Sequence, residues 1–409
     1  TSVAGNSARR IAKYDGTGWS PLGSGLDGWA NCMAVFDDGL GGGPALYVGG
    51  DFTNAGGVSA HRIAKWDGTN WSPLGTGMGI HLHQLQVFDP GTGPALYACG
   101  DFTIAGGVSA NHIAKWNGTN WSALGSGTNL IALSMEVFDS GSGPRLYVGG
   151  IFNDAGGLSV DHIASWNGSS WSSLPGGGLN NQVYDLLTAD IGGGPRLYAV
   201  GMFTQAGGAP AKRIASWDGS SWSNLDAGLN DWAFTLGAFD DGSGPALFAS
   251  GPFTASGSGA TSLRNAGKWN GTSWSALGLG LVGASDVGGM TAFDDGSGSG
   301  PSLYISGDFE YSPETGDSFL ARWRKGGAFP TITAPDSVHV QDPGTPGEVV
   351  FFTVTATGSC EPVVSLTCIP PSGSAFPPGQ TLVTCTAIDA GGDHTVRKFP
   401  VIVGKIRQR

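Results

Sequence analysis

A short block that begins with glycine and proline recurs six times along the chain. Each copy reads Gly-Pro, two variable residues and an aromatic residue, and successive prolines are 50, 50, 51, 50 and 56 residues apart. A fixed period of about fifty residues is typical of architectures in which every unit is one small sheet. The six prolines are Pro44, Pro94, Pro144, Pro195, Pro245 and Pro301.

Each repeat unit contains four short segments with strand character. In the first unit an apolar run at 33–36 precedes the proline, and the segments 46–52, 63–66 and 71–74 follow it. These segments either alternate apolar and polar residues or form bounded apolar runs, and both patterns predict strands. Four strands in fifty residues, repeated six times, predict a six-bladed β-propeller.

The composition favours sheets that pack through glycine and tryptophan. Glycine supplies 72 of 409 residues, well above the average usage of about 7%. Twelve of the fourteen tryptophans occupy two periodic positions of the repeat, where we expect them to pack blade against blade. Asp-Gly or Asn-Gly pairs at 67–68, 117–118, 167–168, 218–219 and 270–271 predict hairpin turns with positive φ.

The two ends of the repeat region do not form complete units. The chain begins inside a unit, at residues 10–22, and the last unit stops after residues 319–323. We therefore expect the propeller to cover residues 1–325, with a strand around Trp19 completing the last blade and closing the ring. The residues leave open whether 11–14 or 320–323 supplies the third strand of that blade.

The repeat resembles a known family. A double glycine at 49–50, an aromatic residue at Trp66 and a tryptophan five residues later at Trp71 resemble a kelch-type repeat. The variant at residues 49–57 also resembles the propellers of cortical polarity-marker proteins and of many secreted bacterial proteins. The resemblance implies the fold and leaves the function open, because such propellers include binding scaffolds and a copper enzyme.

The composition shifts after residue 327, and residues 329–404 read as one sandwich of short strands. Three motifs stand out in this segment: Asp-Pro-Gly at 342–344, the Pro- and Gly-rich stretch 370–379 and the segment 385–392. Together they resemble a hyalin-repeat (HYR) domain, an immunoglobulin-like module of extracellular proteins. The resemblance implies an all-β chain with a C-terminal immunoglobulin-like β-sandwich.

Three of the five cysteines lie in this C-terminal segment. The HYR resemblance implies that Cys368 and Cys385 pair on facing strands and that Cys360 has lost its partner. A disulfide there implies an oxidising compartment. The alternative is three reduced thiols.

The loops that lead into the inner strands are the candidate ligand-binding face, because in a propeller they surround the mouth of the central channel. Trp29 and Trp232 are the tryptophans outside the periodic set, and both are candidate platforms for a sugar ring or a peptide. The alternative is that each plugs the channel mouth. The candidate ligand-binding residues are Trp29, Asn31, His81, His83, Gln182, Tyr184, Asp231, Trp232 and Asp286.

Two patterns raise the question of metal binding. His81 and His83 offer two imidazoles, but no third ligand is identifiable, and structural histidines are the simpler interpretation. The acidic loops 36–39, 239–242 and 293–296 offer oxygen ligands for calcium, whereas one acid and a glycine also suffice for a turn. We expect no cofactor, with calcium as the alternative.

Charge and missing motifs restrict the function classes. The net charge of −12 argues against a nucleic-acid partner, and no stretch approaches the ~20 apolar residues of a membrane span. Phosphate-binding loops, zinc-protease helices and nucleophile elbows are absent from the sequence. We therefore expect a secreted or cell-surface binding protein, with no catalytic residues, that presents a propeller face to an extracellular glycan or protein in adhesion or carbohydrate binding. The alternatives are a self-associating subunit of an extracellular layer or filament, and a channel-mouth enzyme such as a lyase or oxidoreductase.

Overall fold

The structure is a computed structural model, and all of its described secondary structure is β-strand. No helix able to span a membrane is found in the described part of the chain. The described residues are 2–3, 6–15, 18–278, 280–281, 286–294, 300–309, 320–324, 330–341, 347–358, 363–389 and 394–404.

Five four-stranded antiparallel sheets, numbered 1 to 5 in chain order, follow the repeat. Their bounds are β5 (Ala30–Phe36), β6 (Ala45–Gly50), β9 (Ile63–Trp66) and β10 (Trp71–Pro73) in sheet 1; β11 (Leu82–Phe88), β12 (Ala95–Gly100), β15 (Ile113–Trp116) and β16 (Trp121–Ala123) in sheet 2; β17 (Ala132–Asp139), β18 (Pro144–Gly150), β21 (Ile163–Trp166) and β22 (Trp171–Ser172) in sheet 3; β23 (Val183–Ala189), β24 (Arg196–Gly201), β27 (Ile214–Trp217) and β28 (Trp222–Asn224) in sheet 4; β29 (Thr235–Asp240), β30 (Pro245–Ser250), β31 (Ala266–Trp269) and β32 (Trp274–Ala276) in sheet 5.

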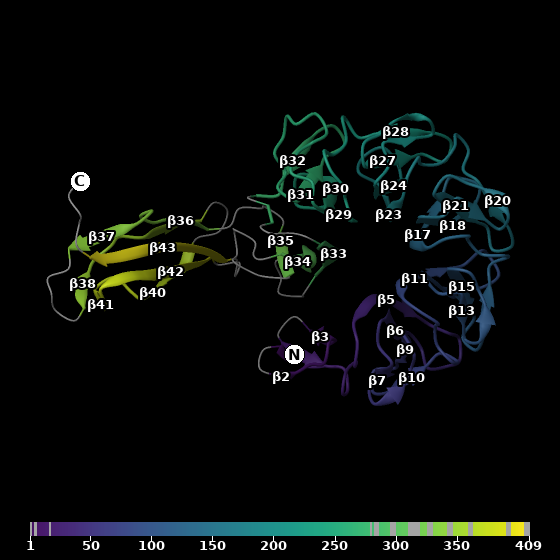
Figure 1. Cartoon of the computed structure of the whole chain (residues 1–409), viewed down its shortest axis with the longest axis horizontal. Helices are drawn as coiled ribbons and strands as arrows, with labels where there is room; N and C mark the ends of the chain where they lie inside the picture. Colours follow the sequence, from purple (N-terminus) through teal and green to yellow (C-terminus); the bar gives the residue numbers. More distant parts are fainter. Residues whose placement is uncertain are drawn as a thin grey trace.

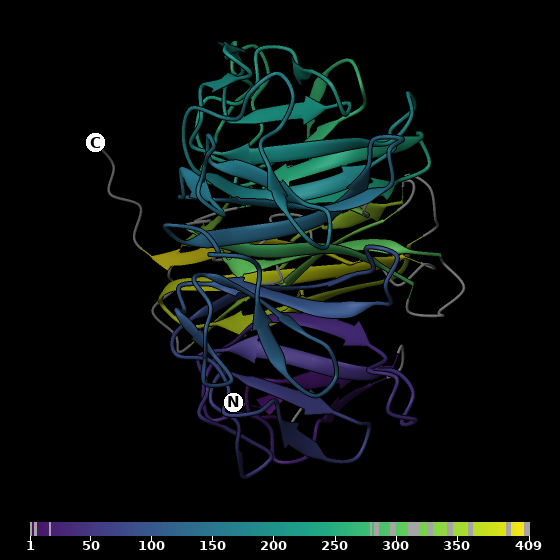
Figure 2. The ribbon, with the colours of Figure 1, turned by 90° about the vertical axis from the view of Figure 1, so that its right-hand side faces the viewer.

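These sheets are arranged around an axis like the blades of a propeller (Figure 1). The first strand of each sheet lies innermost, and β11 contacts both β5 and β17, just as β23 contacts both β17 and β29. Seen from the side, the colours run from purple to teal, so repeats that are neighbours in sequence are neighbours in space (Figure 2). The structure is therefore an all-β, propeller-like fold over this region.

A short hairpin follows the second strand in sheets 1 to 4, where the sequence suggested only a glycine-rich loop. Its strands are two residues long, too short for a periodic pattern to be visible. The hairpins are β7 (Asn54–Ala55) with β8 (Val58–Ser59), β13 (Ile104–Ala105) with β14 (Val108–Ser109), β19 (Asp154–Ala155) with β20 (Leu158–Ser159), and β25 (Gln205–Ala206) with β26 (Ala209–Pro210).

The sixth repeat differs from the expectation. Three strands are described there, β33 (Asp286–Phe293), β34 (Ser302–Asp308) and β35 (Leu320–Arg324), so the C-terminal copy supplies the third strand. The expected closing strand, β4 (Trp19–Pro21), pairs instead with β3 (Ala12–Tyr14). A local hairpin closes a much shorter loop than a strand pair between the ends of the propeller, which lowers its entropic cost.

The N-terminal hairpin is preceded by a second short pair. In it β1 (Ser2–Val3) lies antiparallel to β2 (Asn6–Ser7). Among the described residues neither pair joins the sheet of β33, β34 and β35. The closed six-bladed ring therefore stays a prediction.

Periodic tryptophans and glycines join each sheet to the next, as the sequence predicted. The ring centroids of Trp66 and Trp71 lie 5.2 Å apart, and the Trp71 indole N–H donates to the carbonyl of Leu22 in the preceding unit at 3.0 Å. A side chain at Gly49 would clash with Leu82 of the neighbouring sheet. Gly68, in the predicted Asp-Gly turn, has a φ of 101°, which confirms the expected positive φ.

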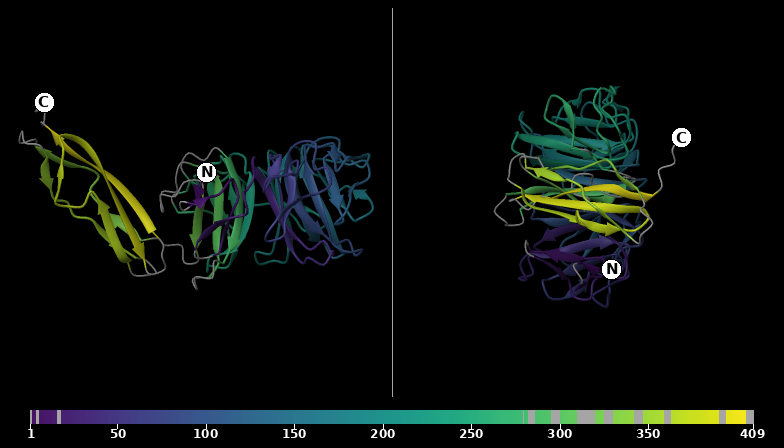
Figure 3. Two further views of the ribbon diagram at one scale, coloured as in Figure 1. Left: turned by 90° about the horizontal axis from the view of Figure 1, so that it is seen from below. Right: turned by 90° about the vertical axis from the view of Figure 1, so that its left-hand side faces the viewer.

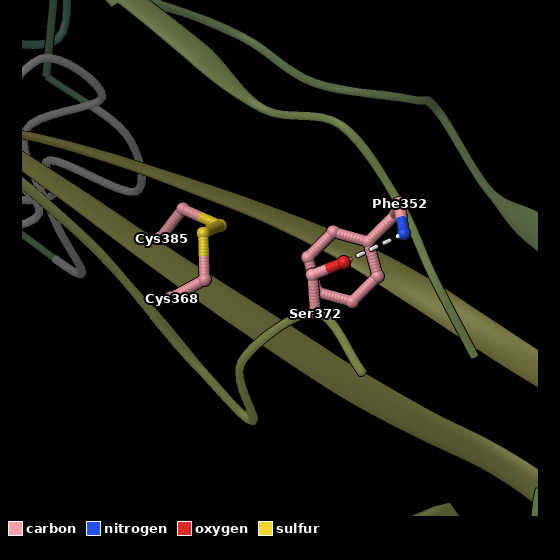
Figure 4. Close-up of a disulfide and its surroundings, with 4 residues drawn as sticks. All are labelled: Phe352, Cys368, Ser372 and Cys385. Carbon is pink, nitrogen blue, oxygen red and sulfur yellow. Dashed lines mark hydrogen bonds between the residues drawn. A yellow bond between two sulfur atoms is a disulfide. The ribbon is translucent and has the colours of Figure 1, made fainter. Parts of the chain in front are cut away.

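The C-terminal region consists of three small sheets around one apolar core. Phe352 packs edge-on against Phe399, with ring centroids 5.1 Å apart, and its backbone N–H donates to the hydroxyl of Ser372 (Figure 4). A disulfide joins Cys368 to Cys385 (Figure 4), while Cys360 lies outside the described residues.

The long strands of this region lie side by side (yellow in Figure 3). One sheet has the order β37, β43, β42, β40, and the pairs β36–β39 and β38–β41 complete the region. The bounds are β36 (Thr331–Thr333), β37 (Val338–Gln341), β38 (Glu348–Val350), β39 (Thr355–Thr357), β40 (Val363–Ile369), β41 (Ser374–Phe376), β42 (Gly379–Asp389) and β43 (His394–Gly404).

Candidate functional site

The predicted ligand-binding positions lie where each inner strand begins. The residue just before the inner strand uses its carbonyl to accept a hydrogen bond from the residue just after the second strand: Asp51 N donates to Trp29 O at 2.8 Å, and Asp101 N to His81 O at 3.0 Å. Met202 N and Gln182 O repeat the bond in sheet 4. The loops before the first strand and after the second therefore meet at one edge of the propeller, which we call the mouth.

Sheets 1 and 2 place two histidine–aspartate pairs at the mouth. His83 Nε2 lies 2.8 Å from Asp101 Oδ1 within sheet 2, and His81 Nδ1 contacts Asp51 Oδ1 of sheet 1. Each contact leaves the other ring nitrogen of its histidine for a ligand. The sequence pointed to both histidines but not to their aspartate partners.

Sheets 4 and 5 place aromatic rings at the same mouth. Tyr184 packs edge-on against Trp232 and Phe234, with centroid distances of 6.5 and 5.5 Å. Burial raises the pKa of the Tyr184 hydroxyl, which therefore remains protonated at neutral pH. Trp29, just before β5, is 71% exposed.

Of the remaining predicted residues, three have a described position and the side chain of the fourth lies outside the described residues. Asn31 Nδ2 donates to Leu82 O at 3.2 Å and so joins sheets 1 and 2. Asp231 Oδ1 accepts the backbone N–H of Trp232 at 2.8 Å. Gln182 is half-buried. Asp286 is the first residue of β33, and its side chain lies outside the described residues.

A second row of side chains lies just inside the mouth and was not predicted. Each inner strand of sheets 1 to 4 carries a β-bulge near its start. In sheets 2 to 4, a side chain at the bulge accepts a backbone N–H of the next inner strand: Ser134 Oγ from Leu186 N at 3.0 Å, and Asp185 Oδ2 from Leu236 N at 2.8 Å. Gln84 Oε1 accepts the N–H of Met135 in the same way. We call the three residues that make these bonds, Gln84, Ser134 and Asp185, the belt.

Two carboxyl groups of the inner strands have perturbed acidity. Burial raises the pKa of Asp185 to about 6, although hydrogen bonds from Leu236, Ser134 and Leu186 oppose the shift. Burial also raises the pKa of Glu136 to about 7, with a smaller contribution from the charge of Asp185. Both groups therefore titrate near neutral pH.

The acidic loops act as turns and ion pairs. Asp89 Oδ1 accepts the N–H groups of Gly91 and Gly93, and Asp38 and Asp241 pair with Lys65 and Lys268. Within the described residues no group of three His, Cys, Asp or Glu side chains is placed to hold a metal ion. The loop at 293–296 falls partly outside them.

A cavity of about 260 Å³ lies away from the mouth, at the turn between β23 and β24. Arg196, Ser216 and Asn224 contribute polar groups to it, and Trp269 of the next sheet forms one wall. It provides an internal control for any test of the mouth.

Comparison with known proteins assigns no family. No protein family matches the chain, and no curated protein is significantly similar to it. Among solved structures, the extracellular domain of a hybrid two-component system from B. thetaiotaomicron is 8% identical, with a TM-score of 0.38; the match covers 92% of this chain and 55% of that protein's chain. The extracellular domain of a one-component system from the same organism is also 8% identical, with a TM-score of 0.42, and the match covers 97% of this chain and 58% of the other.

An ancestral GH74 enzyme is 14% identical, with a TM-score of 0.46, covering 92% of this chain and 55% of its own. The chain thus spans little more than half the length of these proteins. At such values the similarities assign neither a family nor a ligand to this chain.

Proposed function

We propose that this chain is a secreted binding protein whose propeller mouth binds an extracellular glycan. The observation that carries the proposal is the set of aromatic side chains at the mouth: Trp29, largely exposed, and the Tyr184–Trp232 pair. None of them occupies a packing position of the repeat. An exposed indole and half-buried aromatic rings, with polar groups such as His81 and His83 at the same mouth, suit a sugar, which has apolar faces and polar edges.

Secretion and the domain assignments are part of the same proposal. The Cys368–Cys385 disulfide supports an oxidising compartment, and the HYR resemblance of residues 329–404 supports an extracellular module. For residues 1–325 we propose a closed six-bladed ring in which β33 covers β5. Met33 and Val35 of β5 are 58% and 66% exposed, whereas the inner strands of sheets 2 to 5 are covered by neighbours on both sides, which supports such a closure.

A glycan array followed by titration calorimetry tests the proposal. We expect the full chain to bind a subset of glycans, and the Trp29→Ala, Trp232→Ala double variant to lose at least about tenfold in affinity for them. Arg196→Ala, at the separate cavity, is the matched control and is expected to bind normally. Unchanged binding by the double variant, or loss in the Arg196 variant alone, would exclude the mouth as the site.

A second candidate function is a subunit of an extracellular layer. Large apolar side chains of the C-terminal region are well exposed, among them Phe351 at 77% and Ile369 at 69%. Such residues favour contact with a second copy of the chain. Concentration-dependent sedimentation that Phe351→Ser abolishes would support this function, and a monomer at all concentrations would exclude it.

A further inference from the structure

A side-chain clamp fixes the mouth loops in sheets 1, 3, 4 and 5. An Asp or Asn two residues before the mouth position accepts two consecutive backbone N–H groups from the start of the short hairpin region. The bonds are Asp27 with Thr53 and Asn54 (2.8 and 2.8 Å), Asn129 with Asn153 and Asp154 (3.1 and 3.0 Å), Asn180 with Thr204 and Gln205 (2.8 and 2.9 Å), and Asn230 with Thr254 and Ala255 (3.0 and 3.0 Å).

Sheet 2 lacks this clamp because its equivalent residue is Gly79. The backbone is otherwise the same: Gly79 N donates to Ile104 O at 3.0 Å, as Asn180 N donates to Gln205 O at 3.2 Å. A Cβ atom at Gly79 would lie 3.6 Å from Ile104 O and 3.9 Å from Ile104 N, both ordinary contacts. The space for the missing side chain is therefore open, and the Thr103 N–H has no acceptor among the described residues.

Sheet 1 fills the cradle with a carboxylate, whereas sheets 3 to 5 fill it with the neutral amide oxygen of an Asn. The Asp27 carboxylate accepts the N–H and hydroxyl of Thr53 at 2.8 and 2.6 Å, and the N–H of Asn54 at 2.8 Å. Slight burial raises the pKa of Asp27, but the hydrogen bonds from Thr53 and Asn54 outweigh it and hold the pKa well below its usual range. Thr103 can offer the same N–H and hydroxyl donors to a carboxylate, and a charged acceptor forms stronger hydrogen bonds with such donors than a neutral amide oxygen does.

The open cradle lies at the mouth, where the proposed ligand binds. Gly79 is two residues before His81, whose side chain is half exposed. The aspartates nearby, Asp51 and Asp101, each contact a histidine ring nitrogen. We propose that the Gly79 cradle, formed by Thr103 and Ile104, binds the carboxylate of an acidic sugar. This inference rests on the proposed function, which it narrows to glycans that carry uronic acid.

Titration of the full chain with glucuronate, methyl glucoside and acetate tests the cradle, with amide chemical shifts of Thr103 and Ile104 as the readout. We expect glucuronate to shift both amides and Gly79→Asn to weaken its binding at least tenfold. The variant restores the residue found in sheets 3 to 5, so it is expected to fold. Asn180→Gly opens the same cradle in sheet 4 and should create a second site, seen at Thr204 and Gln205.

The outcomes separate this inference from the proposed function. Glucuronate binding that Gly79→Asn leaves unchanged overturns the cradle, even where neutral glycans still bind at the tryptophans. If the Thr103 and Ile104 amide shifts respond to acetate as strongly as to glucuronate, the cradle binds carboxylates in general, and the proposal that it recognises an acidic sugar is wrong. Thr103 and Ile104 amides that respond to no carboxylate show that water alone fills the cradle, whatever the glycan array reports.

Discussion

The mouth and the belt lie at the start of the same inner strands, only one to three residues apart, but their side chains have different roles. At the mouth the side chains change from sheet to sheet: Trp29, His81 and Gln182 occupy one position of the repeat. In the belt, Ser134 and Asp185 have different chemistry but the same task, since each accepts a backbone N–H of the next sheet.

This difference follows from which backbone groups are already satisfied. At the mouth, the backbone carbonyls are bonded to backbone N–H groups, so the side chains are free to vary. In the belt, a side chain accepts a backbone N–H of the next sheet and so joins the two sheets, which makes that side chain part of the framework. The repeat thus separates positions available for ligands from positions needed for stability.

The largest expected effect concerns the belt. Asp185→Ala removes the acceptor of Leu236 N and a partner of Ser134, and a buried unpaired N–H costs about 1–3 kcal/mol. We expect chemical denaturation to show a loss of about 3 kcal/mol with glycan affinity changed little. Asp190→Ala, in an exposed turn, is the control and should cost under about 1 kcal/mol. Equal losses in the two variants would mean that the belt is not a framework.

The next effect is a dependence of stability on pH. The pKa of Glu136 rises from 4.5 to about 7 on folding, so the folded state binds more protons between these values. The contribution of Glu136 to stability is therefore fully present below pH 4.5 and is lost as the pH rises through about 7. Glu136→Gln should flatten this slope by on the order of 2 kcal/mol, measured by denaturation at pH 4.5 and 7.5. If the variant leaves the pH dependence of the unfolding free energy unchanged, that dependence comes from other groups, Asp185 first among them.

The smallest effect is expected at the mouth itself. Trp29→Ala removes a side chain that is mostly in solvent, and such substitutions usually change stability by less than about 0.5 kcal/mol. Thermal melts of this variant should overlay those of the parent chain while glycan binding weakens. A marked drop in melting temperature would place Trp29 in the framework and erase the distinction between mouth and belt.

Much of the fold was predictable because its determinants are local. Strand segments, Asp-Gly turns and the tryptophan positions each repeat within a few residues, and Gly68 and Trp71 behave as their spacing indicated. Ring closure stays a prediction, since among the described residues Trp19 pairs with Tyr14 in a local hairpin that does not join the sheet of the last unit.

The site was predictable only in part. Positions such as Trp29, His81 and Tyr184 follow from aligning the units. The partner of such a residue can come from a distant loop, as Asp51 does, which lies 30 residues from His81. The belt was missed because its side chains bond to the backbone of the next sheet, 51 or 52 residues along the chain, and no short sequence pattern records such a contact. The aligned position occupied by Asp27, Gly79 and Asn129 did hold a signal, because a glycine stands among Asp and Asn residues. This signal could be interpreted only once the hydrogen bonds of the other sheets were known.

The indole hydrogen bonds between sheets have a consequence for how this architecture can change. Trp121 reaches Leu74 and Trp171 reaches Leu124, each 47 residues away, so every such bond spans about one repeat. Stability then accumulates from units and the joints between neighbours, as in other repeat proteins. A duplicated or deleted repeat would meet the same joint on either side. Gene duplication can therefore alter the diameter of the channel in whole-repeat steps without requiring a new kind of interface.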